Sequence, residues 1–210
     1  MNRRERRVAA SKSKRKPIDR IIAVHEAGHA VAKYLTADDM GLSQDNCITY
    51  IDLGDGSVEL SQDKTMILTT QATTYGPKFS ADINAVVMRE TAGKPTGTIQ
   101  EYIQLVAMAA GEGANIEKWV KSRALDAVFG PMAEFRFTGR VVPLTAYEYR
   151  SDLEQLVHDC TIAGLDSELD DVIRGAIDRG AQLLQRPEVG AAIDALAKEL
   201  QAMGVGRMGV

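Results

Sequence analysis

The sequence predicts a mainly α protein with a small β-sheet. Hydrophobic residues make up 45% of the 210-residue chain, yet aromatic residues make up only 5%. Ala, Leu, Ile and Val fill the gap, a composition that favours closely packed helices. Several long segments repeat apolar residues at helical spacing, whereas β-branched residues cluster in residues 47–54. We therefore expect one domain over residues 18–203, with a basic arm before it (residues 1–17) and a tail after it (residues 204–210).

The basic arm carries a charge opposite to that of the rest of the chain. Residues 1–16 hold eight basic residues and one acidic residue, a net charge of +7. Because the whole chain carries −4, the remainder carries −11. Such an arm can contact nucleic acid, anionic lipid or an acidic partner, but blocks of like charge usually stay disordered and solvated. We prefer the second interpretation.

The first expected helix covers residues 18–37. Ile21, His25 and His29 recur every four residues, as on one face of an α-helix. Asp19 stands where a side chain could cap the first turn.

Short strands are expected after a loop over residues 38–46. The run CITYIDLG at residues 47–54 ends in the turn Gly54–Asp55–Gly56. Residues 58–62 and 65–71 are further candidates for strands. The remaining segments expected to be helical are residues 80–91, 99–110, 115–129, 151–163, 166–185 and 187–203.

Gly130 and Pro131 are expected to end the helix over residues 115–129, because both residue types disfavour a helix interior. Residues 135–144, FRFTGRVVPL, then form a strand or an extended loop.

The stretch HEAGH, residues 25–29, has the chemistry of a zinc peptidase. Two of the three histidines in the chain stand here, four residues apart, so both imidazoles can reach one metal ion from the same helix face. Glu26 follows the first histidine and can act as the general base for a zinc-activated water. The alternative is a helix that carries two ordinary histidines.

The residues alone leave the third ligand open. A catalytic zinc site needs three protein ligands and one open position. Ala32 and Leu35 stand where a metzincin would have glycine and histidine, which excludes that class. His158 is more typical of a packing or surface histidine. The acidic candidates on expected helices are Glu112, Asp152 and Asp159.

The sequence VHEAGHAVAKYL at residues 24–35 resembles the metal-binding helix of FtsH-type peptidases, the zinc protease domain usually joined to an AAA ATPase. In that family an aspartate at the start of a later helix is the third ligand. RSDLEQLVHDC at residues 150–160 is similar, so the resemblance implies Asp152 as the third ligand.

Two other segments are also similar to FtsH-type peptidases: the Gly- and Ala-rich residues 105–115 and the closing residues 172–204. The resemblance implies a helical, zincin-like peptidase domain that holds Zn²⁺ and hydrolyses peptide bonds. It also implies an edge strand beside the metal-binding helix that pairs with the substrate. Residues 47–54 are the candidate, and an ordinary sheet strand is the alternative.

The resemblance leaves several partners open. The chain has no GxxxxGK[ST] loop, so an unfolding ATPase would have to act in trans, or the substrate would be a short peptide or an already unfolded protein. Further copies of the chain could form a homo-oligomer. Cys47 and Cys160 form no CxxC pair, and we see no secretory signal or membrane span. These features predict a cytoplasmic protein.

A non-catalytic module is the alternative function. Such a protein would keep the peptidase fold and contact a partner or nucleic acid through the basic arm or a strand edge. The glutamate beside the first histidine disfavours this interpretation, because a structural metal site needs no base.

Overall fold

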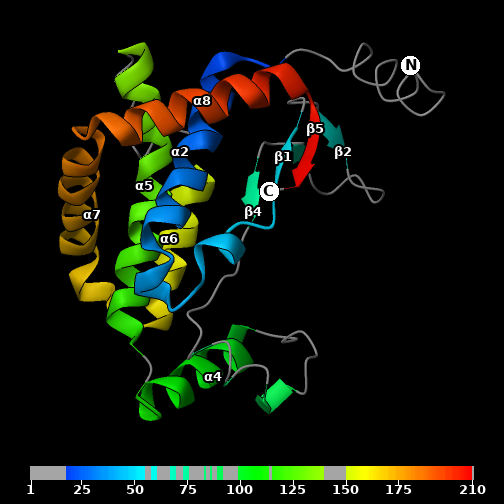
Figure 1. Cartoon of the computed structure of the whole chain (residues 1–210). Helices are drawn as coiled ribbons and strands as arrows, with labels where there is room; N and C mark the ends of the chain where they lie inside the picture. Colours follow the sequence, from blue (N-terminus) through cyan, green and yellow to red (C-terminus); the bar gives the residue numbers. More distant parts are fainter. Residues whose placement is uncertain are drawn as a thin grey trace.

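The structure is mainly helical with small β-sheets (Figure 1), as the sequence predicts. It is a computed structural model, and it describes residues 18–54, 58–60, 67–69, 73–75, 83, 86, 89–91, 99–113, 115–139 and 150–209. The basic arm expected over residues 1–17 lies outside this range.

The helices agree with the expected segments except in the middle of the chain. The long helices are α2 (Arg20–Thr36), α4 (Ile99–Gly111), α5 (Ile116–Thr138), α6 (Arg150–Ile162), α7 (Leu169–Leu184) and α8 (Pro187–Met203). Single 3-10 turns lie at η1 (Asp38–Met40), η2 (Gln44–Asn46) and η4 (Asp166–Glu168). Of the segment expected over residues 80–91, the described positions Ile83, Val86 and Arg89–Thr91 are helical. Within the described residues, every helix is too short or too polar to cross a membrane.

Helices α2, α5 and α8 pack around one apolar core (Figure 1). Val24 and Ala27 of α2, Phe129 and Ala133 of α5, and Ile193 of α8 are fully buried there. Helix α5 also packs on α6 and α7 through a second apolar cluster. It is therefore the element that joins the two halves of the core.

Helix α5 continues through Gly130 and Pro131, so the expectation that these residues end it is wrong. Residues 135–138 are helical rather than extended, and residues 140–144 lie outside the described part. A proline in a helix interior normally costs about 3 kcal/mol. Both residues are buried, and Gly130 lies against His29 of α2. Tertiary packing thus outweighs the low helix propensity.

The described residues form a two-stranded sheet and a three-stranded sheet. Strands β2 (Val58–Leu60) and β3 (Ile67–Thr69) pair antiparallel. Strands β1 (Tyr50–Leu53), β4 (Thr73–Tyr75) and β5 (Gly206–Gly209) form the larger sheet in the order β4-β1-β5, also antiparallel.

Two expectations about the larger sheet are wrong. Residues 47–54 were the candidate for an edge strand, with an ordinary sheet strand as the alternative, and the structure contradicts the edge strand because β1 lies between β4 and β5. Ile51 and Leu53 of β1 are fully buried against the core. We expected residues 204–210 to form a tail, but β5 pairs with β1 and places Met208 opposite Ile51. Strand β4 is therefore an end strand of this sheet among the described strands.

Candidate metal centre

Helix α2 presents both histidines of HEAGH on one face. The carboxylate of Asp19 caps the helix and accepts a hydrogen bond from the backbone N–H of Ile21 at 2.8 Å. Four residues make about one helical turn, so His25 and His29 lie one above the other, with ring centroids 4.7 Å apart. His29 is buried and His25 is partly buried.

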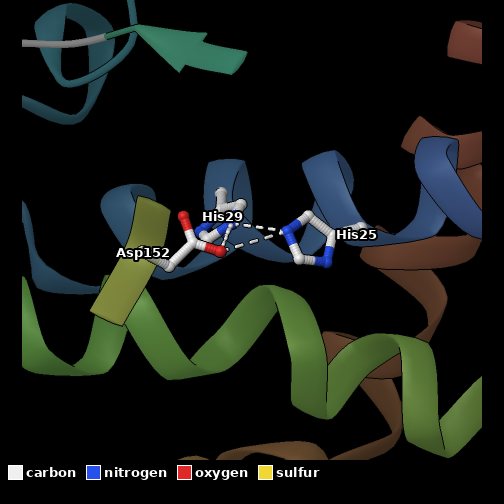
Figure 2. Close-up of side chains that lie close together, drawn as sticks. All are labelled: His25, His29 and Asp152. Carbon is white, nitrogen blue, oxygen red and sulfur yellow. Dashed lines mark hydrogen bonds and ion pairs between the residues drawn. The ribbon is translucent and has the colours of Figure 1, made fainter. Parts of the chain in front are cut away.

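Asp152, in the first turn of α6, points between the two imidazole rings (Figure 2). Its Oδ2 lies 3.4 Å from Nε2 of His25 and 3.6 Å from Nε2 of His29. The two Nε2 atoms are 3.0 Å apart. Among the described residues, these three side chains form the group of ligand atoms close enough to share one ion.

The donor set fits zinc. Zinc binds imidazole nitrogen and carboxylate oxygen at about 2.0–2.2 Å in a tetrahedron, which separates neighbouring donors by about 3.3 Å. The three separations measured here, 3.0, 3.4 and 3.6 Å, bracket that value. Two imidazoles and one carboxylate would leave the fourth position of the tetrahedron for water or substrate.

Helix α5 supports the outer nitrogen of each imidazole. Nδ1 of His29 lies 2.8 Å from the backbone oxygen of Asp126 and 3.3 Å from its carboxylate, so Nδ1–H is the donor. Nδ1 of His25 lies 3.6 Å from the buried carboxylate of Glu134. A proton on Nδ1 makes Nε2 the nitrogen that can bind a metal ion, and such partners also fix the orientation of the ring.

The surrounding carboxylates favour positive charge between the rings. Burial alone would lower the pKa of His29, but Asp152 and Asp126 outweigh burial and raise that pKa well above its usual range. Burial opposes a rise at His25 as well, and Asp152 and Glu134 still raise its pKa. The pKa of Asp152 is lowered despite burial because His29 and His25 stabilise the carboxylate. The carboxylates thus stabilise positive charge on the imidazoles, and a metal ion bound by the Nε2 atoms would have to displace their protons.

Glu26 lies on the side of α2 that contacts the sheet. Its side chain is buried, and Thr74 of β4 donates a hydrogen bond from Oγ1 to Oε2 of Glu26 at 2.8 Å. The same hydroxyl lies 3.2 Å from the backbone oxygen of Glu26. Strand β4 thus holds the orientation of the glutamate that follows the first histidine.

Comparisons with protein-family models, with curated proteins and with solved structures found no match to this chain. Function is therefore inferred from the chemistry of the site.

The other candidate ligands lie elsewhere. Asp159 accepts hydrogen bonds from Arg123 and Gln155, each at 2.9 Å, and is buried in that network. Glu112 follows α4 and pairs with Arg89 at an exposed position. His158 is not among the residues that the structure brings together with His25 and His29.

Sequence reasoning missed Asp126, Glu134 and Thr74. Asp126 and Glu134 are eight residues apart, which places them on one face of a continuous helix. If the expected helix had been continued through Gly130 and Pro131, both acidic residues would have been placed on the same helix. No local signal identifies Thr74, because its place depends on the pairing of β4 with β1.

Proposed function

We propose that the protein is a zinc-dependent metalloendopeptidase, similar in its chemistry to the proteolytic half of FtsH-type proteases. The convergence of His25, His29 and Asp152 supports this proposal most strongly. Structural zinc sites usually have four protein ligands, whereas catalytic sites have three and keep one position open. The presence of Glu26 directly after the first ligand also favours catalysis, because a structural ion needs no base.

In the proposed reaction, bound zinc would polarise the scissile carbonyl and lower the pKa of a water molecule. Glu26 takes a proton from that water, and the oxygen of the water attacks the carbonyl carbon. The same carboxyl group then delivers the proton to the amide nitrogen as the C–N bond breaks. Thr74 holds one oxygen of Glu26 and so orients the carboxylate for both transfers. The products are a carboxylate and an amine.

Strand β4 is the proposed contact for the substrate backbone. It is an end strand of the larger sheet among the described strands, and Thr74 in it reaches Glu26. An extended peptide paired with this strand would lie beside α2, and backbone pairing gives affinity without demanding a particular sequence. We therefore propose peptides and unfolded proteins as substrates.

We also propose two kinds of protein partner, an ATPase and further copies of the chain. A folded substrate would need an unfolding ATPase, which would act in trans, since the 210 residues contain no GxxxxGK[ST] loop. Further copies of the chain could form an oligomer around such a motor. The resemblance of residues 24–35 to FtsH-type peptidases is the basis for both partners.

The experiment compares Glu26→Gln with the wild type on a fluorescently labelled unfolded protein. We expect cleavage to fall about 10²- to 10⁴-fold, because general base catalysis supplies that factor. Zinc content should be unchanged, because the side chain at position 26 is not a ligand in the proposed site. Glu117→Gln, an exposed change on α5, is the control and should cleave at the wild-type rate.

Equal cleavage by wild type and Glu26→Gln would contradict the mechanism. Absence of chelator-sensitive cleavage in the wild type would favour the non-catalytic module instead. That alternative predicts salt-dependent binding to nucleic acid that is lost when residues 1–16 are removed.

A further inference from the structure

Arg123 of α5 contacts two carboxylates that belong to different helices. Its Nη1 donates to Oδ2 of Asp126, also on α5, at 3.1 Å. Its Nε donates to Oδ2 of Asp159 on α6 at 2.9 Å. Both carboxylates are buried, so these are charge-assisted hydrogen bonds shielded from solvent.

Each carboxylate is linked to a candidate metal ligand: Asp126 contacts His29, and Asp159 lies on the same helix as Asp152. Asp126 accepts a hydrogen bond from Nδ1–H of His29 and forms an ion pair with Lys33, so it contacts α2 at two positions. Asp159 follows Asp152 by seven residues on α6, which is two turns along the same face, or about 10 Å along the axis. The second oxygen of Asp159 accepts from Gln155 at 2.9 Å, which orients the carboxylate toward Arg123.

We infer that Arg123 is a positioning residue that holds α6 against α5 so that Asp152 faces His25 and His29. This inference rests on the proposed zinc site. Helix α2 supplies both histidines from one rigid element, but Asp152 comes from a separate helix whose position must be set by contacts elsewhere. The bond between Arg123 and Asp159 is such a contact.

An arginine suits this position better than a lysine. The planar guanidinium presents several N–H donors in a fixed geometry, so one side chain can bind two carboxylates at set directions. An ammonium group is a flexible point charge and would keep the charge without the geometry. Arg123→Lys therefore separates the contribution of the positive charge from that of the guanidinium geometry.

The network is too confined to be a substrate site. The cavity beside it has a volume of about 20 Å³ and is lined in part by Lys33, Ser122 and Arg123. That space holds about one water molecule, whereas sites for organic ligands occupy about 300–1,000 Å³. The network is therefore better explained as a support for the neighbouring metal centre than as a binding site for a separate ligand.

The test measures metal binding rather than cleavage. Zinc affinity is determined by competition with a chromophoric chelator, and the coordination geometry is followed by the visible absorption of the Co²⁺-loaded protein. The variants are Arg123→Met and Arg123→Lys. The matched control is Arg179→Met, which removes an arginine that pairs with Asp39 away from the site. Circular dichroism checks that each variant is folded.

We expect zinc affinity to fall about 10- to 100-fold in both Arg123 variants, as is typical when support of a metal ligand is lost. The Co²⁺ spectrum should shift toward that of Asp152→Ala. Arg179→Met should match the wild type in both measurements. Wild-type affinity and an unchanged spectrum in folded Arg123→Met would overturn the inference and leave the proposed function intact. If the wild type binds no metal, both proposals fail.

A double variant covers the case in which Arg123→Met does not fold because Asp159 is left as a buried unpaired charge. Arg123→Met with Asp159→Asn removes that charge but does not restore the bond between α5 and α6. We expect it to fold and to keep the weakened zinc affinity. Recovery of wild-type affinity and spectrum in the double variant would overturn the inference.

Discussion

The imidazole of His29 lies directly against Gly130, and the absence of a side chain there provides the space for the ring. A Cβ atom placed on Gly130 would lie 2.6 Å from Nε2 of His29, well inside van der Waals contact. The glycine in the middle of α5, at which sequence reasoning ended the helix, is thus part of the wall of the candidate metal centre.

Gly130→Ala should therefore weaken zinc binding. The added methyl group must displace the ring of His29, and we expect zinc affinity to fall roughly 10- to 100-fold, as for other losses of ligand support. Chelator competition measures the change. Gly175→Ala on α7 is the matched control, since a Cβ there meets no atom within 4 Å. Equal zinc affinity in Gly130→Ala and wild type would show that His29 does not bind from this position.

Gly28→Ala should destabilise the fold itself. A Cβ at Gly28 would lie 2.9 Å from the Cβ of Ala133 and from the backbone oxygen of Phe129, where α2 crosses α5. Forcing extra volume into a packed core costs about 1–3 kcal/mol. Urea unfolding should show that loss, whereas Gly175→Ala should be neutral or stabilising by up to about 1 kcal/mol. A Gly28→Ala protein as stable as wild type would contradict the close crossing.

Thr74→Val should reduce the catalytic rate without loss of zinc. The substitution removes the hydroxyl that donates to Glu26 and preserves the shape of the side chain. One hydrogen bond contributes about 0.5–1.5 kcal/mol, which corresponds to roughly a 2- to 12-fold fall in kcat. Thr161→Val, which breaks an exposed contact with Asp166, is the control. A fall in zinc content as large as the fall in kcat would count against this role for Thr74.

The two cysteines should be unreactive in the folded protein. Burial raises the pKa of the Cys160 thiol to about 11 and also raises the pKa of Cys47. At pH 8 only about one Cys160 side chain in a thousand would be the reactive thiolate. We expect an aromatic disulfide reagent to react with both thiols in denaturant and with neither during the dead time of a native assay. A fast native phase would contradict the packing of α6 or η2 around these residues.

The sequence predicted those elements that depend on residues close together in the chain. Helix α2 follows from apolar spacing and from the cap at Asp19, and the facing of His25 and His29 follows from the helix itself. Helices α7 and α8 likewise appear in the apolar pattern. Helix α6 was expected from its own sequence pattern, whereas the choice of Asp152 as a ligand rested on the resemblance; the structure brings Asp152 to the two histidines.

The sequence was least informative where distant contacts decide the structure. Glycine and proline disfavour a helix, so α5 could not be followed through Gly130 and Pro131 without knowledge of the α2 face that packs on it. Strand β5 is the segment GRMG, which has low strand propensity and becomes a strand through its pairing with β1. Asp126, Glu134 and Thr74 were missed for the same reason.

Zinc content of the purified protein tests the proposed function most directly. Elemental analysis would compare wild type with His29→Ala and Asp152→Ala, and His158→Ala is the control with the third histidine removed. We expect one zinc per chain in the wild type and in His158→Ala, and loss or sharp weakening in the other two variants. Full zinc content in Asp152→Ala would assign the third ligand to another residue. No zinc in the wild type, even when zinc is supplied and chelators are avoided, would contradict the metallopeptidase.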